Sequence, residues 1–306
     1  MKLPFIDFMG MRWVTTSISL TLVVLALICL GFRGLNLGLD FTGGTLVEVE
    51  FPAPVDPQAV RVLLETKGYE NGVVQYFGTE RDLLIRMPPQ SDADQSNMGD
   101  EILATLVETY PEVSMRQSNF VGPAVGDELT EDAALAILAS LIVIMLYIMF
   151  RFTKQFAAGA VVSLIHDVII TLGIFSLFRW TFDLSVLAAI LAVIGYSLND
   201  TIVVCDRIRE NFRLIRRSTP TEIINQSINQ TIDRTTITSM TTLFVLLALL
   251  AAGGESIRGF AAALTIGIVV GTYSSIFVAA ALVLMMDIKR EDLLLPDKEK
   301  LDEERP

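Results

Sequence analysis

The sequence predicts an α-helical membrane protein with six transmembrane helices and one small α+β domain between the first and the second helix. Six apolar stretches are long enough to cross a hydrocarbon core of about 30 Å, which takes about 20 helical residues. The composition agrees, since 52% of the 306 residues are hydrophobic and the mean hydropathy is +0.54. The expected spans are residues 14–32, 133–150, 156–178, 184–204, 235–252 and 260–286.

The first apolar stretch is expected to remain as a membrane anchor, within an N-terminal part formed by residues 1–33. It is longer than the apolar core of a signal peptide and lacks a small-x-small cleavage site. The two cysteines, Cys29 in this span and Cys205 at the end of the fourth, are predicted to lie too far apart for a disulfide. Both are interpreted as packing residues.

The distribution of Lys and Arg predicts that both termini are cytoplasmic, because cytoplasmic loops carry an excess of these residues. The outer hairpins after the third and fifth spans hold only Arg179 and Arg258. The opposite side holds a larger set, namely Lys2, Arg12, Arg151, Lys154, Arg207, Arg209, Arg213, Arg216, Arg217 and Arg234. Residues 205–234 are therefore expected to form a cytoplasmic loop, and residues 287–306 a charged cytoplasmic tail.

Residues 34–132 are then expected to form an exported domain. This segment contains 18 Asp and Glu against 5 Lys and Arg, which argues against nucleic acid as a partner and fits a solubilising surface. Its hydrophobic pattern predicts the order βαββαβ of a ferredoxin-like domain. The expected strands are 45–51, 73–77, 83–87 and 113–120, with helices from Asp56-Pro57 and over 97–109. Without a His, a Cys pair or a Gly-rich phosphate loop in this segment, a binding or force-bearing module is favoured over an enzyme.

Polar residues within the spans are functional hypotheses by default, because ionisable groups are costly in lipid. The fourth span carries Tyr196, Asn199, Asp200 and Thr201, with Tyr196 and Asp200 on one helix face. Arg234 opens the fifth span and is followed by hydroxyl residues, Thr238 among them. Such hydroxyls either line a hydrated path or bond back to their own helix.

Asp200 and Arg234 are the candidate proton relay, since a guanidinium that does not titrate can switch a nearby carboxylate. A static buried ion pair is an equally open interpretation from these residues alone. His166 and Asp167 in the third span are further candidates, although a lone His more often packs or bonds between helices. No metal or organic cofactor is expected.

Two further patterns concern packing. Gly267 and Gly271 in the sixth span form a GxxxG pattern, which predicts close helix approach within the chain or at a subunit interface. Residues 219–222 (TPTE) read as a helix start, so a short amphipathic helix is expected through Thr231 on the cytoplasmic surface.

Three strings, in this order, resemble signatures of the SecD/SecF family of export proteins. They are GLDFTGGT at residues 38–45, YSLNDTIVV followed by DRIREN over 196–211, and DRTTITS at 233–239. The resemblance covers residues 37–290. The exported domain is small, and in this respect the chain resembles the SecF branch of the family, since the other branch has a large exported region.

The resemblance implies a subunit that works with SecD, the SecYEG channel and YajC in a bacterial inner membrane. It would use the proton-motive force to draw preproteins out on the periplasmic side, with protons as the coupling ion, and its membrane fold would be similar to that of RND transporters. By motif position, Asp200 corresponds to the intramembrane acid and Arg234 to its basic partner, while Asp40, Gly43 and Gly44 belong to a structural signature.

Two alternatives remain open at this point. One is a subunit of an RND-type small-molecule exporter, which would require a larger exported domain with a binding cleft. The other is a scaffold that stabilises the translocase without proton chemistry, in which Asp200 and Arg234 would tolerate neutral substitution.

Overall fold

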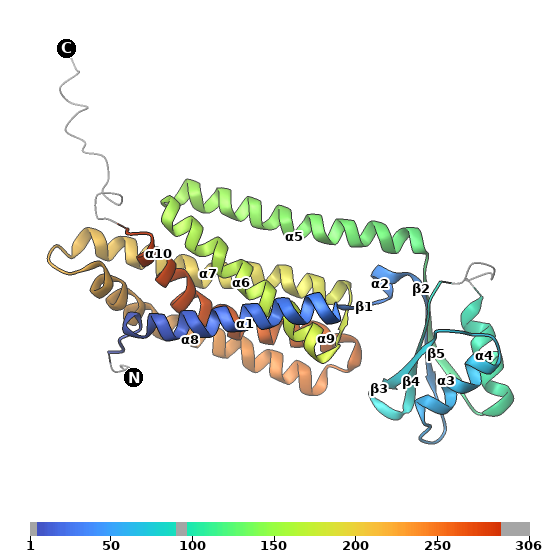
Figure 1. The fold of residues 1–306 in the computed structure, drawn as a ribbon. Helices are drawn as coiled ribbons and strands as arrows, with labels where there is room; N and C mark the ends of the chain where they lie inside the picture. Colours follow the sequence, from blue (N-terminus) through green and yellow to red (C-terminus); the bar gives the residue numbers. More distant parts are fainter. Residues whose placement is uncertain (1–4, 90–96, 289–306) are drawn as a thin grey trace, which may run out of the picture.

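The molecule consists of a helical bundle with an α/β domain at one end (Figure 1). The structure, a computed structural model, describes residues 5–89 and 97–288. In this part of the chain six helices are long and apolar enough to cross a membrane. They are α1 (Arg12–Arg33), α5 (Pro123–Arg151), α6 (Lys154–Phe178), α7 (Leu184–Leu214), α8 (Pro220–Ala252) and α9 (Glu255–Ser274), the last continued by the π-helical turn η2 (Ser275–Ala279) and α10 (Ala280–Met285).

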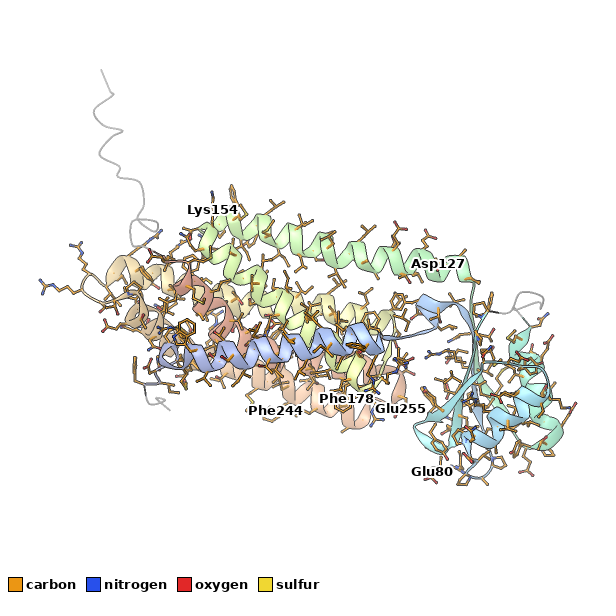
Figure 2. The ribbon with its side chains drawn as sticks, viewed as in Figure 1. Glu80, Asp127, Lys154, Phe178, Phe244 and Glu255 are labelled. Carbon is orange, nitrogen blue, oxygen red and sulfur yellow. The ribbon has the colours of Figure 1, made fainter. Side chains whose placement is uncertain are left out.

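Three of these helices form the centre of the bundle. About half of the apolar window of α6, α7 and α9 is buried, against 17% or less for α1, α5 and α8. α7 packs on α6, α8 and α9, whereas α5 lies at the edge against α6. α5 runs along the bundle from Asp127, near the α/β domain, toward the end where Lys154 lies, and Phe244 projects from the outer face of α8 (Figure 2). The peripheral helices therefore leave broad apolar faces for lipid or for another membrane protein.

The helices extend beyond the predicted apolar spans and into residues 205–234, the segment expected to form a cytoplasmic loop. α7 continues to Leu214 and α8 begins at Pro220, so only residues 215–219 lie between them. The predicted helix start is confirmed, because Thr219 and Glu222 form a capping box. The separate amphipathic helix is wrong. Buried isoleucines of this segment pack with Ile208 and Phe212 of α7, which keeps the helix continuous into the fifth span.

The α/β domain has the predicted order of elements, with boundaries shifted by a few residues. It comprises β2 (Gly44–Glu50), α3 (Pro57–Thr66), β3 (Val73–Phe77), β4 (Thr79–Met87), α4 (Met98–Thr109) and β5 (Ser114–Val121). The sheet order is β3-β4-β2-β5, and each neighbouring pair is antiparallel. Val47 and Val49 alternate toward a core that also holds Leu64 of α3 and Leu106 of α4. The polar stretch 90–97 between the third strand and the second helix, which we expect to be a loop from its sequence, lies, except for Asn97, outside the described residues.

Short elements join the domain to the bundle, and none of them was predicted. β1 (Asn36–Leu37) pairs in parallel with β6 (Thr181–Phe182), which ties the segment after α1 to the turn between α6 and α7. The next element, α2 (Leu39–Thr42), leads through Gly43 directly into β2. Elements of two to four residues carry too little periodic pattern to be recognised in a sequence.

Candidate functional site

Asp200 lies on α7 in the interior of the bundle. Its exposed fraction is 3%, and its Oδ2 atom is buried without a hydrogen-bond partner among the described residues. The carboxylate lies close to the Ser239 hydroxyl of α8 and within electrostatic reach of Arg234. A buried acceptor oxygen needs a hydrogen-bond partner, and internal water is the ordinary one.

Arg234 does not form the close pair that the sequence suggested. Its side chain is exposed at the surface of α8, and no ion pair within 4.0 Å joins it to Asp200 in the described parts of the chain. Its attraction to Asp200 acts over a longer distance. The arrangement is an open one, in which an arginine on the bundle surface faces an acid inside it.

The Ser239 hydroxyl beside Asp200 also contacts α9. The Ser239 and Thr272 hydroxyls are 2.7 Å apart and bridge these two helices. Thr235, one turn before Ser239, has a buried hydroxyl with no partner among the described residues. Thr238 instead donates to the Arg234 and Thr235 carbonyls of its own helix, at 3.1 and 3.0 Å. Thr238 thus bonds back to its own helix, whereas a hydrated path along α8 stays a prediction.

The other candidate residues of α7 differ in their surroundings. The hydroxyls of Tyr196 and Thr201 are buried and have no partner within the described ranges. Asn199 is exposed on the outer side of α7. Tyr196, Thr201 and Asp200 thus place three unbonded oxygens within two turns of one helix, and internal water is the ordinary partner for such groups.

A second polar centre is formed by Asp167 of α6, whose exposed fraction is 0%. Its Oδ2 accepts hydrogen bonds from Ser197 of α7 at 2.6 Å and from Ser274 of α9 at 2.8 Å. Its Oδ1 lies 2.9 Å from His166 Nδ1. One carboxylate therefore connects the three central helices, and Ser197 is one turn from Asp200 on α7.

His166 continues this centre toward α1. Its ring stacks on Tyr273 with centroids 6.3 Å apart, while its Nε2 is buried without a partner in the described residues. The Tyr273 hydroxyl donates to the Thr15 carbonyl at 2.8 Å and lies 3.0 Å from the Ser19 hydroxyl. Immediately after Ser274, α9 changes into the π-helical turn η2, a feature often found at functional sites.

The two glycines of the sixth span lie against α7. A Cβ atom at Gly267 would overlap the Val193 side chain, and one at Gly271 would come within 2.9 Å of Ser197 Cβ. The Gly271 Cβ position is also 3.5 Å from Asp167 Oδ2 of α6, the carboxylate to which Ser274 of the same helix donates. These glycines face a helix of the same chain.

The signature residues Asp40, Gly43 and Gly44 lie where the α/β domain joins the bundle. Asp40 Oδ2 accepts a hydrogen bond from the Leu184 backbone N–H at the start of α7, at 3.0 Å. Gly43 and Gly44 have φ values of 66° and 112°, which favour glycine. A Cβ atom at Gly44 would also overlap the Met87 carbonyl oxygen.

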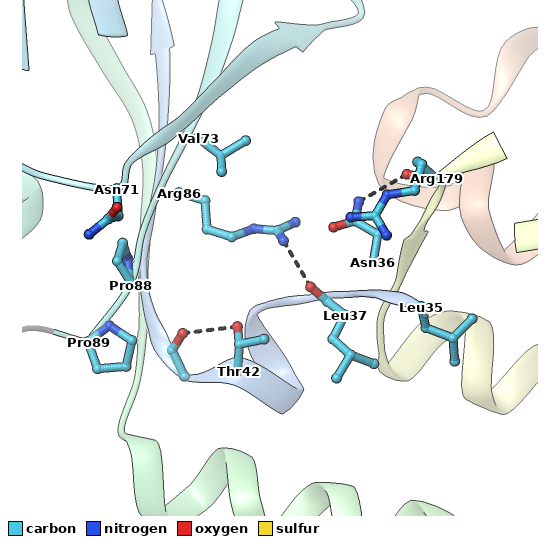
Figure 3. Close-up of a pocket in the computed structure, with 11 residues that line it drawn as sticks. Leu35, Asn36, Leu37, Thr42, Asn71, Val73, Arg86, Pro88, Pro89 and Arg179 are labelled. Carbon is cyan, nitrogen blue, oxygen red and sulfur yellow. Dashed lines mark hydrogen bonds between the residues drawn. The ribbon is translucent and has the colours of Figure 1, made fainter. Parts of the chain in front are cut away.

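A cavity of about 340 Å³ lies between this joint and the sheet (Figure 3). Arg86 of β4 extends into it, and its Nη1 donates to the Leu37 carbonyl at 2.9 Å. Burial lowers the pKa of the Arg86 guanidinium, and attraction to Asp183 and Asp40 opposes that effect. Arg86 therefore links the domain to charged residues at the end of the bundle.

The chemistry available inside the bundle is proton binding and hydrogen bonding. In the described residues no group of three or more His, Cys, Asp or Glu side chains could hold a metal ion. Asp200, by contrast, is an ionisable group with a free oxygen and an arginine nearby. The site lies in the part of the molecule that a membrane would surround.

Several residues of these centres could not be recognised from the sequence. Ser197, Tyr273, Thr272 and Ser274 carry ordinary hydroxyls that no local pattern singles out. Their importance comes from contacts over long separations, such as the 107 residues between Asp167 and Ser274. One sequence signal could have indicated them. It is a Ser or Tyr that lies within two turns of a GxxxG pattern, on a helix expected to pack against a helix that carries an acid.

The fold and the buried polar residues define a polytopic membrane protein with ionisable groups inside its bundle. A family profile described as "Protein export membrane protein SecD/SecF, C-terminal" matches residues 101–289, and a second, "SecD/SecF GG Motif", matches residues 30–55. The chain therefore belongs to the SecD/SecF family of protein export membrane proteins.

Curated relatives agree over nearly their whole length. The chain is 50% identical over 293 residues to the protein translocase subunit SecF of Vibrio alginolyticus, covering 95% of this chain and 93% of the relative. It is 45% identical over 302 residues to SecF of Escherichia coli O157:H7, covering 98% and 94%.

Two solved structures of SecDF are also similar. The crystal structure of SecDF from Thermus thermophilus, described as a translocon-associated membrane protein, matches with a TM-score of 0.84 and 40% identity, covering 93% of this chain. A super-membrane-facing form of SecDF matches with a TM-score of 0.71 and 40% identity, covering 94% of this chain. The chain spans 39% and 40% of those longer chains.

Proposed function

We propose that the chain is the SecF-type subunit of the Sec preprotein translocase and that proton movement through its membrane bundle promotes late export. In this proposal it assembles with SecD, and with it the SecYEG channel and YajC, in a bacterial inner membrane. Its α/β domain contacts the preprotein in the periplasm, and both termini are cytoplasmic. It has no enzymatic activity of its own, and protons are its coupling ion.

The single observation that carries this proposal is the Asp200 carboxylate. It is 3% exposed and keeps an unbonded oxygen in the middle of a helix long enough to cross the membrane. A buried carboxyl group in this environment can bind and release a proton. Each change in its charge alters its attraction to Arg234. A residue that served only to fix helix register would be expected to have its hydrogen bonds satisfied, as those of Asp167 are.

The available energy is sufficient for a conformational change. One charge that crosses a potential of about 150 mV releases roughly 3.5 kcal/mol. An equilibrium between two arrangements of the bundle shifts by more than a hundredfold for that energy. Movement of a single proton per cycle can therefore drive the domain from one position to another.

The distribution of charge supports the proposed orientation. The cluster of arginines from Arg207 to Arg217 lies at the end of the bundle remote from the α/β domain, on the same side as Lys154 (Figures 1 and 2). The acidic domain lies at the other end. We also assign the domain to the ferredoxin-like class, a proposal supported by its order of elements and by its strand order β3-β4-β2-β5.

The proposal is tested by export assays in membrane vesicles, with the chain replaced by Asp200→Asn or Arg234→Met. We expect both variants to assemble with SecD in a pull-down but to lose the stimulation of export by the proton-motive force. The matched control is Asp206→Asn, which removes the same charge from an exposed position of α7.

The outcomes separate a motor from a scaffold. Loss of stimulation in Asp200→Asn with intact assembly and a normal Asp206→Asn control supports proton coupling. Export by Asp200→Asn at the wild-type level, with the complex assembled, would show that the chain stabilises the translocase without proton chemistry.

A further inference from the structure

We propose that Asp40 is a positioning residue that couples helix α7, which carries Asp200, to the α/β domain. This inference rests on the proposed function, because it explains how a change at the relay would reach the domain. It assigns to the signature at residues 40–44 a mechanical role at the start of α7.

The first contact is a helix cap supplied from outside the helix. α7 is capped by its own preceding residue, because Asp183 Oδ1 accepts from the Val186 N–H at 2.9 Å. The Leu184 N–H, at the first position of the helix, is left over, and it donates to Asp40 Oδ2 at 3.0 Å. A carboxylate at this position also interacts favourably with the helix dipole. α7 is thereby attached to α2, a segment 144 residues away in sequence.

Apolar and backbone contacts reinforce this attachment. The Phe41 and Phe182 rings stack with centroids 5.5 Å apart, on either side of the junction between α2 and α7. The Gly38 N–H donates to the Phe182 carbonyl at 2.7 Å. A Cβ atom at Gly38 would come within 3.0 Å of Asp183 Cβ. α2 is therefore held against the beginning of α7 on several sides.

The second part of the connection runs from α2 into the sheet. Gly43 and Gly44 have positive φ values and turn the chain directly into β2, which lies inside the sheet between β4 and β5. A Cβ atom at Gly43 would come within 3.0 Å of Pro123 Cα, at the start of α5. The chain entering the domain and the chain leaving it are thus packed together. No loop separates α2 from the central strands.

These contacts make a short rigid connection between the relay and the domain. Asp200 lies 16 residues after Leu184, or about 24 Å along one continuous helix. A tilt or shift of α7 at Asp200 moves its N-terminus and, through Asp40 and α2, moves β2. From the domain side, Arg86 donates to the Leu37 carbonyl and is attracted over a longer distance to Asp183 and Asp40.

The two SecDF structures differ in how closely they match this chain. The chain matches both at 40% identity over 93% and 94% of its length, yet with TM-scores of 0.84 and 0.71. The two structures therefore differ from each other within the region that this chain matches. Within the described ranges, β1, α2 and Gly43 form the continuous segment that joins the end of α1 to β2.

The test measures domain position in the assembled complex with SecD. Spin labels at Ala104, exposed on α4, and at Ser256, exposed at the start of α9, report the distance between domain and bundle. Both native cysteines are replaced beforehand. We expect the wild-type distance distribution to shift between mildly alkaline and mildly acidic buffer. Asp40→Ala should abolish that shift, and with it the stimulation of export by the proton-motive force should be lost.

Two further variants separate coupling from simple destabilisation. Asp56→Ala removes a cap of the same type from α3, where Asp56 Oδ1 accepts from the Gln58 N–H at 3.0 Å, and it should keep the shift. Asp40→Asn keeps an oxygen acceptor for Leu184 and should restore most of the coupling. A wild-type shift in Asp40→Ala, or no shift in the wild-type complex, overturns the inference. Unchanged export in Asp200→Asn would overturn the proposed function instead.

Discussion

Replacement of Asp167 with Ala removes the acceptor that joins three central helices. The carboxylate oxygen Oδ2 accepts from Ser197 on α7 and from Ser274 on α9. Interhelical hydrogen bonds in membranes contribute about 0.6 kcal/mol on average and up to about 1.7 kcal/mol. Loss of both bonds therefore predicts a destabilisation of about 1–3 kcal/mol.

The assay is reversible unfolding of the purified protein in mixed micelles, with the fraction of SDS as denaturant. Ser163→Ala is the matched control, because Ser163 is fully buried on the same helix but donates only to the Ala160 carbonyl of that helix, at 2.8 Å. Asp167→Asn keeps one carbonyl acceptor and should fall between the two. If Asp167→Ala is no less stable than Ser163→Ala, the carboxylate does not hold the helices together.

Two further predictions concern the joint and the N-terminal segment. Gly44→Ala should lower the free energy of unfolding by at least about 1–3 kcal/mol, because φ is 112° and the new Cβ would overlap the Met87 carbonyl. Gly122→Ala should change it little, since no atom lies within 4 Å of its Cβ position, and equal melting temperatures for the two variants would contradict the argument. The pKa of the Asp7 carboxyl lies below its ordinary value, chiefly because the Asn225 side chain donates to it and also because of the Gly10 N–H. A lowered folded-state pKa adds stability above the unfolded value of about 3.9, and this stability disappears as the pH falls through the folded value. Protection of the Ile6 amide, which donates to Asn229, should therefore decrease in acid in the wild-type protein but much less in Asn225→Ala, and acid-independent protection in the wild type would refute this.

The six spans and the order of elements in the α/β domain could be predicted because each follows from a local pattern. A hydrocarbon core requires long apolar helices, and alternation along β2 follows from a sheet with one covered face. The ends of α7 and α8 could not be predicted in this way. They extend outside the apolar spans because Phe212 packs against Ile224 and its neighbours, which is a tertiary contact.

The candidate site was predictable in its residue types but not in its connections. Asp200 and Asp167 are recognisable as acids inside apolar helices. Which of them has its hydrogen bonds satisfied depends on Ser197 and Ser274, and hence on the close packing of α9 on α7. The bond from Leu184 to Asp40 joins positions 144 residues apart, and no local pattern encodes it.

The most direct test of the account is whether Asp200 exchanges a proton inside the membrane. Infrared difference spectroscopy of the assembled complex, between mildly alkaline and mildly acidic buffer, detects the carbonyl band of a carboxyl group as it becomes protonated. The account predicts a band in the wild-type complex that persists in Asp206→Asn and disappears in Asp200→Asn. An identical band in Asp200→Asn, or none in the wild type, would contradict it.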